Sequence, residues 1–138
     1  MTELEKQTFV DRFAAAWAAR DGDAFLALWD PHGRLHYPFA NRVIMGAEIG
    51  KLNDLTKTIA PHLIMTWKLV DWTSRDDVLV IEWESSNRYG ERVIVWRGVD
   101  KMTLRDGKII EEIVYCDTAP LQALRRRMKF DALIQFPD

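Results

Sequence analysis

The chain has 138 residues, a formal net charge of −2, and apolar residues at 48% of its positions. This composition is typical of one soluble globular domain, and the near-balanced charge excludes a general attraction to nucleic acid or acidic membranes. The single cysteine, Cys116, excludes an intramolecular disulfide and any metal site built from several cysteines.

The first part of the chain is predicted to form two helices. Apolar residues recur at helical spacing over residues 3–20, and Thr2 with Glu5 is a capping-box pattern at the start of this segment. Asp21-Gly22 then ends the helix, and Asp23 can cap a second short helix that runs through Trp29.

A short strand and a third helix follow. Residues 34–37 are expected to form the strand, which Pro38 ends. The third helix is expected from Gly46 to about Ala60, because Pro61 cannot continue it.

The rest of the chain is mostly β. Residues rich in Val, Ile, Trp and Thr, separated by polar turn clusters, form segments 63–73, 78–87, 92–104 and 108–117. Asp106-Gly107 predicts a type I′ hairpin turn, which requires positive φ at both central residues. The short connections predict an antiparallel meander, and Pro120 begins a last helix to about Met128. Helices segregated from strands in this way indicate an α+β fold, in one domain over 1–138 with its C-terminal helix and tail over 119–138.

This pattern resembles the nuclear-transport-factor-2-like superfamily, which includes ketosteroid isomerases and SnoaL-type polyketide cyclases. The resemblance rests on the order and spacing of Trp17, Asp21-Gly22-Asp23, Tyr37-Pro38, Gly46 and the Gly98–Asp117 segment. It implies a cone-shaped, cystatin-like α+β barrel whose curved antiparallel sheet carries three N-terminal helices on its concave face. It also implies a mostly apolar pocket for a small hydrophobic molecule, no cofactor, and a homodimer formed through the sheet.

Asp100 and Asp117 are the candidate acids. Strand alternation places Asp100 on the face that also carries Ile94, Trp96, Gly98 and Met102, which predicts an inward carboxyl, although it could instead point to solvent. By the resemblance, Asp100 matches a protonated Asp of ketosteroid isomerases, and Asp117 matches the acid/base of SnoaL-type cyclases. Asp117 could equally serve as the N-cap of the last helix.

Tyr37 is the third catalytic candidate. By the resemblance, it matches the position of the isomerase base, just before Pro38. It could donate a hydrogen bond to a ligand oxygen or simply pack as a core aromatic residue. The expected ligand-binding residues are aromatic: Phe13, Trp17, Trp29, Trp96 and Tyr115. No metal-ligand spacing is present.

These features predict binding of a small, hydrophobic, oxygenated molecule, with cofactor-free isomerisation, cyclisation or dehydration by pocket Asp residues. The alternative is a non-catalytic module for ligand binding or dimerisation. Neither a nucleic acid nor a membrane is expected as a partner. The N-terminus lacks the apolar run of a signal peptide, so a cytoplasmic location is expected.

Overall fold

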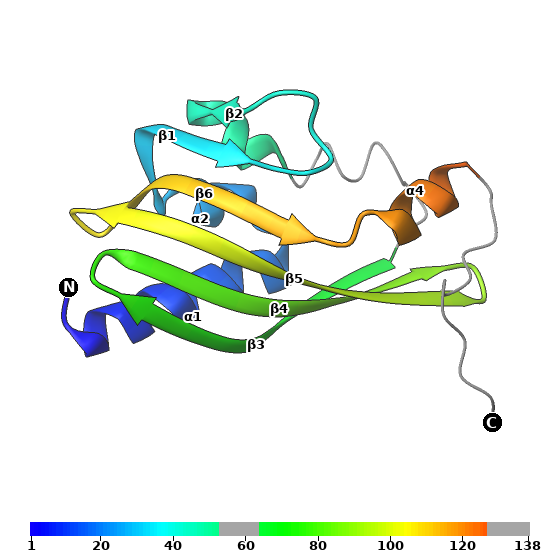
Figure 1. The fold of residues 1–138 in the computed structure, drawn as a ribbon, viewed down its shortest axis with the longest axis horizontal. Coiled ribbons are helices and arrows are strands. Elements are labelled where there is room, and N and C mark those ends of the chain that lie inside the picture. Colours follow the sequence, from blue (N-terminus) through cyan, green and yellow to red (C-terminus); the bar gives the residue numbers. More distant parts are fainter. Residues whose placement is uncertain (53–63, 127–138) are drawn as a thin grey trace.

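A computed structural model of the chain describes residues 1–52 and 64–126 (Figure 1). Its elements, in chain order, are α1 (Glu3–Ala19), α2 (Gly22–Leu26), β1 (Trp29–His36), β2 (Ile44–Met45), a short 3-10 helix (Gly46–Lys51), β3 (Ile64–Arg75), β4 (Val78–Tyr89), β5 (Arg92–Arg105), β6 (Lys108–Cys116) and α4 (Ala119–Arg125). No helix among these residues has the length and apolar character needed to cross a membrane.

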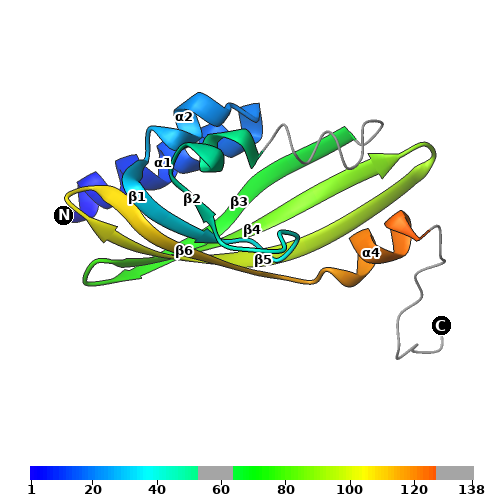
Figure 2. The ribbon, with the colours of Figure 1, turned by 90° about the horizontal axis from the view of Figure 1, so that it is seen from above.

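The strands form one curved six-stranded sheet with the order β2-β1-β6-β5-β4-β3 (Figure 2). Strands β3 to β6 pair with their chain neighbours in antiparallel fashion, as their short connections predict. Strand β1, in contrast, pairs with β6 in parallel. The predicted α+β cone fold is therefore confirmed, with the correction that the sheet is mixed rather than wholly antiparallel, and open rather than closed into a barrel.

The hairpin between β5 and β6 has the turn that its sequence predicts. Asp106 and Gly107 have φ values of 52° and 73°, which is the pair of positive angles of a type I′ turn. This turn sets the first pairs of the hairpin, Arg105 with Lys108 and Leu104 with Ile109, and a register shift follows between Leu104 and Thr103.

The helices differ from their predicted lengths. Asp21 rather than the predicted Asp23 caps α2, and its side chain accepts hydrogen bonds from the backbone N–H groups of Asp23 and Ala24. Helix α2 ends at Leu26 rather than at the predicted Trp29. The strand that follows begins at Trp29 rather than at residue 34. The predicted third helix begins as a 3-10 helix, and its part beyond Leu52 lies outside the described residues, as do residues 127–138 of the last helix and tail.

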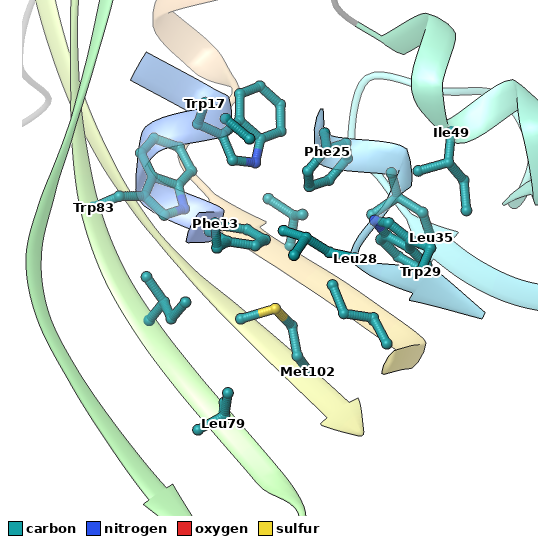
Figure 3. Packing of buried hydrophobic residues seen from close by; sticks show 14 of the residues in the cluster. Phe13, Trp17, Phe25, Leu28, Trp29, Leu35, Ile49, Leu79, Trp83 and Met102 are labelled. Atoms are coloured by element: carbon teal, nitrogen blue, oxygen red, sulfur yellow. The ribbon is translucent and has the colours of Figure 1, made fainter. Parts of the chain in front are cut away.

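Helices α1 and α2 cover one face of the sheet, here called the inner face, whereas α4 follows the end of β6 away from them (Figure 2). Aromatic rings from both helices pack edge to face in the core between these layers (Figure 3). Phe25 has its ring centroid 5.2 Å from that of Trp17 and 5.6 Å from that of Phe13. Trp17 in turn stacks on Trp67 of β3, at 6.4 Å, which ties α1 to the sheet.

Candidate functional site

The inner face of β5 carries the first candidate acid. Trp96, Gly98, Asp100 and Met102 are all buried, and Asp100 is only 2% exposed. Arg97 and Lys101, which alternate with these residues, are exposed on the opposite outer face. The alternation predicted for this strand is therefore confirmed, and Asp100 points into the protein.

The Asp100 carboxylate has a neighbour that holds it in place. The indole Nε1–H of Trp83 on β4 donates a hydrogen bond of 2.9 Å to Asp100 Oδ1. Trp83 pairs across the strands with Gly98, and a Cβ added to Gly98 would overlap the Trp83 ring. Only glycine at position 98 leaves room for the indole in this position.

A second acid, Glu112, lies beside Asp100, and the sequence analysis did not single it out. Its side chain is fully buried on β6, where it pairs with Met102 and so stands diagonally across the ladder from Asp100. Neither carboxyl oxygen of Glu112 has a hydrogen-bond partner in the described part of the chain. Two buried carboxyl groups therefore share one region of the inner face.

The position of Glu112 follows from an irregularity in β6. The register shifts between the Thr103–Glu111 and Leu104–Ile109 pairs, so an extra residue interrupts the alternation of this strand. Ile109 and Glu112 then both face inward, which simple alternation does not allow. The turn alone would pair Met102 with Glu111, so the sequence carried no signal that pointed to Glu112.

Burial changes the ionisation of both acids. It raises the pKa of Asp100 to about 7, while the hydrogen bond from Trp83 opposes this rise because it stabilises the charged form. Burial raises the pKa of Glu112 well above its ordinary value, and the negative charge of Asp100 raises it further. No ion pair to either carboxyl occurs among the described residues. The pair therefore keeps at least one proton near neutral pH.

Tyr37 lies next to these acids. It directly follows β1, whose Leu35 and His36 pair with Glu112 and Ile113, and it packs against the core. Burial raises the pKa of the Tyr37 hydroxyl, and the nearby charges of Cys116 and Asp100 add to the rise. The hydroxyl group therefore stays neutral and can donate a hydrogen bond.

A cavity of about 320 Å³, largely open to solvent, lies where β1 ends. Its lining residues come from the end of β1, the following loop and β6: His36, Tyr37, Pro38, Ala40, Asn41, Arg42, Val43, Ile113 and Val114. Val114 pairs directly with Asp100. Tyr37 and Val114 thus border both the cavity and the buried acids.

Comparison with known proteins then places the fold in a family. The model of a SnoaL-like domain matches residues 10–112, which is most of the chain. The chain belongs to the SnoaL-like family.

Solved structures similar to this SnoaL-like domain share its fold at low sequence identity. TerC, co-crystallised with polyporic acid, has a TM-score of 0.74 at 15% identity, over 88% of this chain and 98% of that chain. AclR, a putative hydroxylase from Streptomyces galilaeus, has a TM-score of 0.73 at 15% identity, over 96% and 87%. A putative SnoaL-like polyketide cyclase from Jannaschia sp. CCS1 has a TM-score of 0.71 at 19% identity, over 88% and 91%. A comparison with curated protein sequences gives no match.

Two predicted site residues of the SnoaL-like domain lie apart from the buried acids. Asp117 is exposed, and its Oδ1 accepts a hydrogen bond of 2.9 Å from the backbone N–H of Ala119 at the start of α4, which is the capping role. Tyr115 is 57% exposed on the outer face, because the preceding Val114 faces inward. Tyr115 therefore lies on the opposite side of the sheet from the other predicted ligand-binding residues.

The remaining predicted ligand-binding residues are buried on the inner side of the domain. Phe13 and Trp29 lie in the apolar core, and Trp17 and Trp96 are each 8% exposed. The indole N–H groups of Trp17 and Trp29 have no hydrogen-bond partner within the described residues. These donors could therefore bind an acceptor atom of a ligand or an ordered water.

The SnoaL-like domain offers no evident metal centre in residues 1–52 and 64–126, where no three His, Cys, Asp or Glu side chains are grouped to hold an ion. The two buried acids can exchange protons and take part in hydrogen bonds.

Proposed function

We propose that this SnoaL-like domain binds a small, hydrophobic, oxygenated molecule and catalyses cofactor-free acid/base chemistry on it, such as isomerisation, cyclisation or dehydration. The observation that carries the proposal is the pair of buried carboxyl groups, Asp100 and Glu112, on neighbouring strands of the inner face. Buried acids with raised pKa values are suited to proton transfer near neutral pH.

The local contacts favour different roles for the two acids. Asp100 accepts the hydrogen bond from Trp83, which stabilises its anion, so Asp100 takes a proton from the carbon next to a substrate carbonyl. Glu112 has the more strongly favoured neutral form and donates its O–H to the carbonyl oxygen, where negative charge develops. Asp100 then returns the proton to another carbon. This assignment reverses the role of Asp100 that the family resemblance implies.

Tyr37 and Val114 are placed to meet the substrate. Both line the cavity at the end of β1, and the neutral Tyr37 hydroxyl can orient an oxygen of the substrate. Asp117 has no part in this proposal, because its carboxylate is exposed and caps α4. Trp17 and Trp96 supply apolar surface on the inner side.

The experiment uses 2-tetralone, a small ketone with acidic protons next to its carbonyl, in D₂O. Proton NMR would follow the exchange of these protons for deuterium, which requires only proton abstraction and return. We expect the wild-type chain to exceed the buffer rate, and Asp100→Asn and Glu112→Gln each to lower the excess by about 10²-fold or more. Asp117→Asn is the matched control and should retain the rate.

Two outcomes would overturn the catalytic proposal. One is exchange by the wild-type chain at no more than the buffer rate. The other is equal loss in the Asp117→Asn and Asp100→Asn variants while near-ultraviolet circular dichroism shows both folded. Binding of the ketone without exchange would support the alternative of a non-catalytic ligand-binding module.

A further inference from the structure

The cavity at the end of β1 is lined by polar residues that the proposed acid/base chemistry does not use. They include Arg42, His36 and Asn41, and the lining contains no Asp or Glu. The rest of the lining is mainly apolar, from residues such as Pro38 and Val43. A cavity lined by both hydrogen-bond donors and apolar side chains fits an amphipathic ligand.

Two contacts hold the guanidinium of Arg42 in place, but they do not use all of its hydrogen-bond donors. Its Nη1 donates to the carbonyl oxygen of Val43 at 3.2 Å, and its Nη2 lies 2.8 Å from Glu48 Oε2. The side chains of Arg42 and Glu48 are 62% and 50% exposed, so their ion pair contributes little stability and can yield to a ligand. A guanidinium carries five N–H donors, and these two contacts leave others available.

His36 is also held in a defined orientation. Its Nε2 lies 3.1 Å from Glu111 Oε1, and the same oxygen accepts a hydrogen bond of 3.0 Å from Arg34 Nη2. The other ring nitrogen, Nδ1, has no protein partner among the described residues. Glu111 itself is not among the residues that line the cavity.

We propose that this cavity binds the carboxylate group of a small hydrophobic monocarboxylic acid. The carboxylate takes up the remaining donors of Arg42 in the planar, two-pronged geometry that a guanidinium favours, with His36 and Asn41 at its side. The apolar body of the acid packs against Pro38, Val43 and Val114. This inference does not depend on the acid/base chemistry, because binding at Arg42 requires neither buried acid.

The first test compares benzoate with benzamide, its neutral analogue of similar shape, on the full chain by isothermal titration calorimetry and amide NMR. We expect benzoate to bind at least about tenfold more tightly and to shift the amide signals of Asn41, Arg42 and Val114. Equal affinities for the two probes, or no benzoate shifts at these residues, would overturn the proposal.

The second test uses exposed variants that should leave the fold intact. Arg42→Gln should weaken benzoate binding about tenfold or more. Arg42→Lys should bind benzoate more tightly than Arg42→Gln but less tightly than the wild-type chain, because lysine has the positive charge but not the planar guanidinium. Arg97→Gln is the matched control, since Arg97 is also exposed and lies 2.8 Å from a glutamate, Glu84, on the outer face.

Glu48→Gln should change the affinity for benzoate in the opposite direction to Arg42→Gln. Removing this carboxylate frees Arg42 for the ligand, so benzoate should bind more tightly than to the wild-type chain. A loss of affinity in Glu48→Gln, or equal effects of Arg42→Gln and Arg97→Gln, would refute the assignment of the carboxylate to Arg42.

Discussion

Trp83 donates its indole N–H to the carboxylate of Asp100 across two paired strands, and both groups are buried. The bond forms because Gly98, the residue paired with Trp83, has no side chain to lift the ring from the sheet. Burying a charged carboxylate raises the free energy of the folded state unless the carboxylate accepts a hydrogen bond. The indole N–H of Trp83 donates that hydrogen bond to Asp100. Burial raises the pKa of Asp100, and the hydrogen bond across these two strands partly opposes that rise.

Gly98→Ala tests this geometry. The added Cβ should displace the Trp83 ring, lengthen its hydrogen bond to Asp100, and lower the free energy of unfolding by about 1–3 kcal/mol through overpacking. Urea unfolding would measure the change. In a Trp83→Phe background, which already lacks the hydrogen bond, the same substitution should cost less. Equal costs in the two backgrounds would show that Gly98 and Trp83 do not interact.

The raised pKa of Asp100 predicts a particular dependence of stability on pH. Between about pH 4 and pH 7 the unfolded chain loses this proton while the folded chain keeps it, so stability falls as the pH rises. The loss attributable to Asp100 is on the order of 4 kcal/mol as an upper bound. Asp100→Asn should flatten the pH profile of the unfolding free energy over this range. An unchanged slope in that variant would contradict the raised pKa.

We expect Glu112 to lower the free energy of unfolding while it serves the proposed acid/base activity. Its carboxyl group is fully buried without a hydrogen-bond partner in the described residues, so Glu112→Leu should raise the free energy of unfolding at pH 7 by about 1–3 kcal/mol. The same variant should lose the proton-exchange activity on 2-tetralone. Glu82→Gln, at an exposed position of β4, should change stability by less than about 0.5 kcal/mol. A clear loss of stability in Glu112→Leu would mean that Glu112 has a favourable partner.

The outer face of the sheet is expected to form the homodimer. Val93 and Val95 of β5 and Tyr115 of β6 are each at least half exposed there, so this face presents apolar side chains that a second copy could cover. Val95→Lys should therefore shift the chain from dimer to monomer in analytical ultracentrifugation. Val70→Lys, at an exposed irregularity of β3, is the control and should leave the dimer intact. A wild-type chain that is monomeric at all concentrations would rule out this interface.

Local chemistry made much of the fold predictable. Asp106-Gly107 dictates its turn regardless of distant contacts, because few residue pairs accept positive φ at both positions. The inward side of Asp100 followed from alternation along a strand whose opposite face carries Arg97 and Lys101. Both predictions rest on residues within one hairpin.

Features that depend on distant parts of the chain were not predictable in the same way. The inward position of Glu112 depends on an extra residue in β6, which alternation cannot reveal without its partner strand. Asp30-Pro31-His32-Gly33 has the composition of a turn, yet it belongs to β1, where the register with β6 shifts between Trp29 and Arg34. The parallel pairing holds this segment in the sheet despite its local preference.

The pairing of β1 with β6 has a consequence for the order in which the protein can fold during synthesis. Strand β1 emerges from the ribosome before β3, β4 and β5, whereas the strand that completes it in the sheet, β6, is made after all of them. Until then Leu35 has only the short β2 as a strand neighbour among the described residues. A nascent chain that ends before Lys108 lacks β6, so the edge of β1 that pairs with β6 stays unpaired. We expect such a chain to bind chaperones, which protect unpaired strand edges from aggregation.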